Sequence, residues 1–190
     1  MNAITTIETE PQRRLFTVDE VLAMQSAGLF DADERKFELI EGELILRQSK
    51  LNPHELYKNE LARAFYRLLP EDVSTWVEPT LYLRPFNAPD PDLMVFPRGR
   101  SIDELAPDEV FLVVEVADTT LRTDLGVKAA IYAWHGLAEY WVIDARAPRL
   151  VVHRGPDGEH WREIRTLGPD EAVAPLAFPQ ALIRLADLAR

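Results

Sequence analysis

Apolar residues at helical spacing predict two helices in the first third of the chain. Thr17 and Glu20 have the spacing of a capping box, and Gly28 is suited to end the short helix that follows. Residues 52–55 combine a cap residue, a proline at the first helical position and an acid in the first turn. The residues that then recur at helical spacing are Tyr57, Leu61, Phe65 and Leu68. We therefore expect a second, longer helix to begin near residue 52.

Short apolar runs predict strands between and after these helices. Residues 36–40 and 43–46 are expected to pair as a hairpin through Glu41 and Gly42, because glycine tolerates the positive φ of a tight turn. The next extended segments are residues 73–77, 80–84 and 92–96. Asp92 is thus expected to open a strand.

The second half of the chain is expected to contain the centre of the sheet. Residues 110–116 show no polar alternation, which is typical of a strand covered on both faces. Thr119 or Thr120 can cap a helix that Gly136 ends. The apolar residues expected to share one face of that helix are Val127, Ile131 and Trp134. The remaining predicted strands are residues 139–144, 150–153 and 161–165, with the last two pairing across residues 155–158.

This order predicts an α/β (α+β) fold: a mixed central β-sheet flanked by helices, with an N-terminal hairpin and a C-terminal antiparallel extension. At 190 residues and 47% apolar content, the chain suits one domain. We expect a flexible tail over residues 1–14 and a single domain over residues 15–190. The core is expected to include Tyr140, Trp141 and Trp134, which follow the apolar periodicity rather than forming a platform for stacking bases.

Composition narrows the kinds of site that are possible. The chain has no cysteine, so any metal must be held by oxygen or histidine, and this usage suits a reducing cytoplasm. The first residues lack the basic and apolar regions of a signal peptide, and no apolar run approaches the roughly 20 residues that span a membrane. A net charge of −11 opposes diffuse attraction to nucleic acid, although a bound cation reverses the field locally.

Glu115 is the most informative residue, because a carboxylate inside an apolar strand loses hydration and needs a cation or several donors. Asp92 lies 23 positions earlier (115 − 92 = 23) and follows Pro91. If their strands are neighbours, the two carboxylates can share a hard cation such as Mg²⁺. The alternatives are a paired structural acid at Glu115 and an ordinary aspartate–proline turn at Asp92.

Lys128 is the basic residue expected beside these carboxylates. It follows Val127, so its side chain is expected to project from the helix flank toward the strand end, where an ammonium would orient a water or balance charge in the transition state. The alternative is a surface ion pair with Asp124, four residues earlier. The other polar residues, for which the pattern alone favours an ordinary surface position over a site role, are Glu38, Glu41 and His54.

An ordered set of short motifs resembles the Uma-two family, whose members are regarded as endonucleases. The matching segments are residues 37–43, 91–93, 114–116, 128–132 and 136–144, within a span of about residues 15 to 165. That family belongs to the restriction-endonuclease-like superfamily, which is named for its PD-(D/E)XK signature. The resemblance implies a restriction-endonuclease-like mixed sheet and Mg²⁺-dependent hydrolysis of phosphodiester bonds, with Mn²⁺ as a substitute ion.

The resemblance also assigns roles to individual residues. It implies a catalytic set of Asp92, Glu115, Lys128 and Glu38, and metal ligands at Asp92, Glu115 and Val116. The superfamily signature places its lysine two residues after the second acid, but this chain has Ala117 there, so the role passes to Lys128. Residues 117–120 are Ala-Asp-Thr-Thr, where family members commonly have a serine-proline-serine-like stretch.

Three functions remain open from the sequence. The first is a metal-dependent nuclease. The second is a nuclease-like binding or regulatory module without catalysis, which Ala117 and the acidic charge favour. The third is a pair of carboxylates that acts on a glycosidic bond.

Nucleic acid, and DNA in particular, is the expected partner. The basic residues expected to contact it are Lys58, Arg63, Arg67, Arg98 and Arg100. Superfamily relatives often pair to address two strands, so a homodimer is expected by analogy.

Overall fold

A six-stranded mixed sheet forms the centre of the computed structural model, which describes residues 13–30, 36–47 and 52–189. The strands follow one another in chain order: β3 (Val73–Val77), β4 (Leu93–Pro97), β5 (Leu112–Ala117), β6 (Glu139–Asp144), β7 (Arg149–Asp157) and β8 (His160–Leu167). All neighbouring pairs are antiparallel except β5 and β6. The predicted mixed sheet and its C-terminal antiparallel extension are therefore confirmed.

A helical crossover joins the parallel strands β5 and β6, as parallel neighbours require. It consists of α3 (Leu121–Thr123), a π-helical turn η3 (Asp124–Lys128) and α4 (Ala129–Trp134). The chain then reverses at Gly136, which has a φ of 77°. The predicted helix end at this glycine is confirmed.

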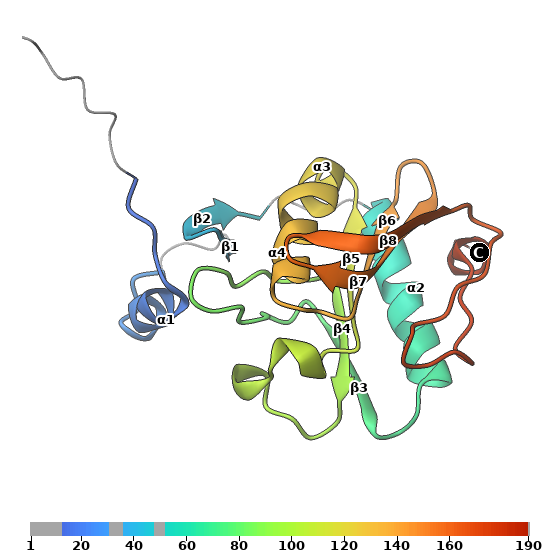
Figure 1. The fold of residues 1–190 in the computed structure, drawn as a ribbon, viewed down its shortest axis with the longest axis horizontal. Coiled ribbons are helices and arrows are strands. Elements are labelled where there is room, and N and C mark those ends of the chain that lie inside the picture. The colour runs from blue at the N-terminus through green and yellow to red at the C-terminus, as the bar shows by residue number, and fades with distance from the viewer. Residues whose placement is uncertain (1–12, 31–35, 48–51, 190) are drawn as a thin grey trace, which may run out of the picture.

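Helices cover both faces of the sheet. The helix α2 (Asn52–Leu68) lies on one side of β5, and α4 lies on the other (Figure 1). Leu61 and Phe65 of α2 pack in one core cluster with Val114, whereas Tyr132 of α4 packs with Val113 in a second cluster. Because successive side chains of a strand point to opposite faces, β5 is buried on both sides, as its lack of polar alternation predicts. The short C-terminal helix α5 (Leu185–Leu188) joins the α2 side.

The N-terminal segment adds a small separate layer. Helix α1 (Val18–Ser26) begins with the predicted capping box at Thr17, and its chain turns at Gly28 with a φ of 74°. Strands β1 (Phe37–Ile40) and β2 (Glu43–Leu46) form the predicted hairpin. Gly42 has a φ of 79°, and a Cβ there would lie 2.7 Å from the Cβ of Leu15, so this turn needs glycine. Two short 3₁₀ helices, η1 (Ile102–Glu104) and η2 (Pro107–Glu109), connect β4 to β5.

Two strand predictions differ from the structure. Residues 80–84 contribute no named strand to the described part of the chain, because Leu83 pairs with Asn87 across a local reversal. The ladder of β7 and β8 extends through the pair Pro156 and Trp161, so the reversal uses residues 158–159 rather than 155–158. Of the expected tail over residues 1–14, residues 1–12 lie outside the described residues. No helix in the described part of the chain is long and apolar enough to cross a membrane.

The predicted buried face of the crossover helix was wrong at Trp134, which is 66% exposed. Ile131 is buried as expected, but the inward stripe also contains Asp124, Lys128 and Tyr132. The π-helical turn begins at Asp124 and ends at Lys128, and both of these charged residues are buried against the sheet. The spacing of apolar residues alone instead predicts a buried face made of Val127, Ile131 and Trp134.

Candidate active site

Asp92 and Glu115 lie opposite each other at one end of the sheet. The antiparallel ladder of β4 and β5 pairs Leu93 with Val114, so the next position on each strand brings Asp92 across from Glu115. Strand alternation puts both on the face that Met94 shares. Both side chains line a cavity of about 160 Å³. The convergence expected from the sequence is therefore present.

The carboxylate of Asp92 is 3% exposed and accepts two hydrogen bonds on Oδ2. One comes from the backbone N–H of Val116, at 2.7 Å, and the other involves Nε2 of His54, at 2.9 Å. Because an ionised carboxylate only accepts, Nε2 of His54 carries the proton of this bond. The donors from β5 and α2 thus hold the carboxylate in a defined orientation.

Glu115 is 4% exposed and is held through Oε1. Lys128 Nζ and Tyr132 Oη donate to this oxygen at 3.0 Å and 3.1 Å. Burial raises the pKa of Glu115 well above its ordinary value, and the charge of Lys128 opposes that rise. The carboxylate therefore sits where additional positive charge is electrostatically favourable.

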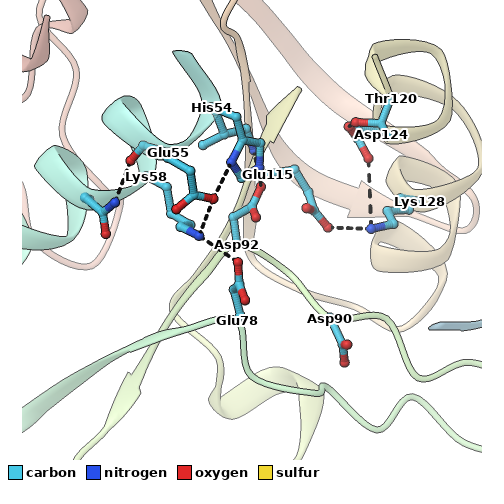
Figure 2. Close-up of polar contacts among 12 residues, drawn as sticks. His54, Glu55, Lys58, Glu78, Asp90, Asp92, Glu115, Thr120, Asp124 and Lys128 are labelled. Atoms are coloured by element: carbon cyan, nitrogen blue, oxygen red, sulfur yellow. Dashed lines mark hydrogen bonds and ion pairs between the residues drawn. The ribbon is translucent and has the colours of Figure 1, made fainter. Parts of the chain in front are cut away.

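Lys128 is the shared counter-ion of the acids beneath the crossover helix (Figure 2). Its Nζ lies 3.0 Å from Oε1 of Glu38 and 4.0 Å from Oδ1 of Asp124. Burial alone lowers the pKa of Lys128, but attraction to Glu115, then to Glu38 and Asp124, outweighs it and raises the pKa above its ordinary value. The ammonium stays charged. The surface pair with Asp124 considered from the sequence is instead a buried contact.

Asp124 belongs to the same cluster. The Thr120 hydroxyl donates to Oδ2 of Asp124 at 2.6 Å, so this threonine contacts a side chain, and no side-chain bond to the backbone caps α3. Burial raises the pKa of Asp124 to about 6, with Lys128 and the Thr120 hydrogen bond acting in the opposite direction. Asp124, Lys128 and Tyr132 are four residues apart in turn and all face the sheet from the π-bulged helix, a distortion that is frequent at functional sites.

The hairpin supplies Glu38, which is buried on β1. Its Oε1 accepts the backbone N–H of Asp90 at 3.0 Å as well as the Lys128 ammonium. Asp90 in turn is paired with Arg47 at 3.2 Å. Glu41 is not part of the cluster: it is exposed at the hairpin turn, with a φ of 51°. The surface position favoured by the pattern alone is right for Glu41 and wrong for Glu38.

The donor set suits a hard cation. The acids that line the cavity outnumber its two basic residues, Lys128 and Arg47, so negative charge is in excess; these acids are Glu38, Asp90, Asp92, Glu115, Asp118 and Asp124. Within the described residues, Oε2 of Glu38 and Oε2 of Glu115 receive no hydrogen bond. The same residues contain no ready-made group of three acid or histidine ligands. Mg²⁺ often uses one or two carboxylates and keeps several waters, so the residues fit such an ion.

Sequence reasoning missed His54, which is 4% exposed rather than a surface residue. A signal was available: His54 and Lys58 are four residues apart and lie on the same stripe as Tyr57 and Leu61, which are buried. Ala117, two residues after Glu115, is fully buried in the sheet, and the ammonium beside Glu115 comes from the crossover helix as Lys128.

The structure contradicts one of the predicted nucleic-acid contacts, Lys58, and places the four predicted arginines away from the cavity. Lys58 is 5% exposed and donates to Glu55 and Glu78, so it is not a surface cation. Arg98 and Arg100 follow β4, whereas Asp92 precedes it, so they lie at the opposite end of that strand from the site. Arg63 and Arg67 are exposed but follow His54 by nine and thirteen residues along α2, roughly 14 Å and 20 Å at 1.5 Å per residue.

Comparison with known proteins agrees with this architecture. A search among curated proteins finds no match. Among solved structures, the chain is similar to one from Anabaena variabilis described as "a putative nuclease belonging to DUF820", with a TM-score of 0.72 and 21% identity. That similarity covers 91% of this chain and 97% of the other, and at this identity it shows the fold alone. A family model named Uma2, described as "Putative restriction endonuclease", matches residues 18–187. Because this match includes every strand and all the converging side chains, the chain belongs to the Uma2 family.

Proposed function

We propose that this protein is a metal-dependent nuclease that hydrolyses phosphodiester bonds of nucleic acid, with DNA as the substrate. The observation that carries the proposal is the buried convergence of Asp92 and Glu115 beside the Lys128 ammonium in one cavity. Membership of the Uma2 family and the restriction-endonuclease-like architecture support it.

Asp92 and Glu115 would hold Mg²⁺, or Mn²⁺ in its place, together with the backbone of Val116, the residue that follows Glu115. In a β-strand, the N–H and the C=O of one residue point to the same side. The N–H of Val116 donates to Asp92, so the carbonyl oxygen of Val116 also points toward the Asp92 side of the strand. When bound, such an ion polarises a phosphate and favours ionisation of a water.

The residues of the chain have separable tasks in this proposal. Lys128 keeps its proton, so it supplies fixed positive charge near a transition state that gains negative charge and does not act as a base. Its ammonium also holds Glu115 and Glu38 in place. Tyr132 fixes the same oxygen of Glu115 through its hydroxyl. Burial strengthens each of these interactions by excluding bulk water.

Two arginines that were not among the predicted contacts, Arg122 and Arg146, adjoin residues that line the cavity. Thr120, which precedes α3, and Thr123, its last residue, line the cavity, and α3 carries the exposed Arg122. Asp118 also lines the cavity and is paired with Arg146, from the turn after β6. Both arginines thus lie beside the carboxyl ends of the parallel strands, where ligands commonly bind in such sheets. We propose that Arg122 and Arg146 form a basic rim that contacts the phosphate backbone of the nucleic acid.

A cleavage assay with matched variants tests the proposed function. The wild-type protein should nick plasmid DNA with Mg²⁺ or Mn²⁺ and stop when EDTA is added. Asp92→Asn and Glu115→Gln should each reduce the rate by about 100-fold or more, because each removes charge that holds the ion. Glu41→Gln, which changes an exposed acid outside the cluster, is the control and should cleave normally. Equal rates for wild type and Asp92→Asn would discard the assignment.

The second candidate is a nuclease-like binding or regulatory module. It is favoured by Ala117 at the usual lysine position and by the lack of a three-ligand cage in the described ranges. Calorimetric titration separates the two functions. Specific capture of a protein partner, with no heat from Mg²⁺ or Mn²⁺, would support the module and contradict the nuclease.

A further inference from the structure

A second charge network lies beside Asp92, on the side away from Lys128 (Figure 2), in which His54 and Lys58 are buried and Glu55 and Glu78 are partly exposed. We infer that His54 is a positioning residue that sets the orientation of the Asp92 carboxylate, supported by the ion pairs of Lys58. This inference rests on the proposed function, because it gives Asp92 the metal-holding role.

The contacts form a ring that begins and ends at Asp92. Nε2 of His54 lies 2.9 Å from Asp92 Oδ2, and Nδ1 lies 3.3 Å from Glu55 Oε1. Lys58 Nζ donates to that same Glu55 oxygen at 2.8 Å and to Glu78 Oε1 at 2.6 Å. The backbone N–H of Glu78 then donates to the Asp92 carbonyl at 3.0 Å. Both the side chain and the backbone of Asp92 are therefore held.

Two features of the ring raise the free energy of the folded protein, so their presence calls for an explanation. Glu78 has a φ of 52°, in the left-handed region that non-glycine residues seldom adopt. Nδ1 of His54 is buried without a hydrogen-bond partner: its 3.3 Å contact with Glu55 lacks hydrogen-bond geometry. A buried polar atom without a partner typically costs about 1–3 kcal/mol. An apolar residue at position 54 would avoid that cost, so the imidazole is better explained by its bond to Asp92 than by packing.

The bond to Asp92 has a geometric consequence. His54 and the Val116 N–H both meet Oδ2, from α2 and β5 respectively, so together they fix the plane of the carboxylate and the direction of Oδ1. Carboxylates that ligate metals are commonly held by such hydrogen bonds, and loss of the partner typically lowers metal affinity or activity by about 10–100-fold. The ion pair of Lys58 with Glu78 keeps the start of α2 beside the beginning of β4, so the His54 imidazole can reach the Asp92 carboxylate.

Mn²⁺ titration of two His54 variants of the full chain tests this role. Leucine removes the donor, whereas glutamine can place an amide N–H near the position of Nε2. We expect His54→Leu to weaken Mn²⁺ binding, measured by calorimetry without nucleic acid, by about 10–100-fold, and His54→Gln to stay within a few-fold of wild type. His160→Leu, at an exposed histidine of β8, is the matched control. Equal Mn²⁺ affinity in His54→Leu and wild type would overturn the inference.

Hydrogen exchange of the Val116 amide gives a readout that needs no metal. If His54 holds Asp92 in place, His54→Leu should speed Val116 exchange relative to Val114, while His54→Gln should restore it. Global destabilisation would speed both amides alike, and that result in both variants would show a merely structural role. If the wild type binds no Mn²⁺, the proposed function fails, and unchanged relative exchange at Val116 then also refutes the positioning role.

Discussion

At the scale of single residues, the site is dominated by buried charge. Glu38, Glu115 and Asp124 share Lys128 as their ammonium, and each is almost inaccessible to water. Such an arrangement gains little net stability over an apolar core, but breaking it on one side leaves an uncompensated charge. The cluster is therefore better suited to function than to stabilising the fold.

The variant Lys128→Met tests how much stability is lost when the buried acids have no counter-charge. We expect the variant to lose about 3–5 kcal/mol of unfolding free energy, because Glu115 and Glu38 lose their counter-charge. Adding Glu115→Gln should recover part of that loss without restoring DNA cleavage. Urea unfolding and the plasmid assay measure the two effects. A Lys128→Met protein as stable as wild type would contradict the role of Lys128 as counter-charge, and a double variant that cleaves DNA would contradict the role of these residues in cleavage.

At the scale of elements, the crossover between β5 and β6 decides which residues enter the site. Its π-helical turn η3 places Asp124 and Lys128 inward and leaves Gly126 on the surface. In the hairpin of β1 and β2, by contrast, the glycine has no free space beside it, because Gly42 lies tightly against Leu15. The two glycines therefore differ in what a side chain would meet.

A pair of alanine substitutions measures that difference. Gly126→Ala should stabilise the protein by up to about 1 kcal/mol, since nothing lies within 4 Å of the added Cβ and alanine favours helix. Gly42→Ala should destabilise it, because the Cβ would meet Leu15 at 2.7 Å and the φ of 79° disfavours alanine. Thermal unfolding of both variants provides the comparison. Destabilisation by Gly126→Ala would show that the π-helical turn needs glycine.

At the scale of the molecule, the net charge of −11 disfavours diffuse contact with nucleic acid, so the exposed arginines nearest the cavity matter most. Arg98 and Arg100 lie at the far end of β4, and Arg100 is paired with Glu109. Arg122 and Arg146 lie at the end of the sheet that holds the cavity. Nucleic acid that approaches the carboxylates is expected to meet these two first.

Binding measurements test this rim. Arg122→Ala and Arg146→Ala, made in the Asp92→Asn background with EDTA, should weaken binding of a labelled duplex in fluorescence anisotropy. Each should also lower the slope of log K against log salt by about 1, because one phosphate contact is lost. Arg63→Ala, on the exposed side of α2, is the control. Greater weakening from Arg63→Ala than from Arg146→Ala would move the binding surface to α2.

The sequence by itself determined the order and type of most elements. The capping box at Thr17, the turn at Gly42 and the apolar run that contains Glu115 depend on local backbone preferences and on side-chain alternation. These are properties of neighbouring residues, so they can be recognised without the fold. The sequence also placed Asp92 and Glu115 on two short strands that could be neighbours, but their antiparallel pairing comes from the structure.

Only the tertiary structure decided which polar residues are inside. Trp134 faces outward while Lys128 faces inward, and His54 and Lys58 are buried on a helix face that looks mixed in sequence. A helix turns toward the sheet whichever face makes the best total contact, and a buried acid on the sheet makes a lysine or histidine a good partner. That choice depends on residues far apart in the chain, which periodicity within one helix does not contain.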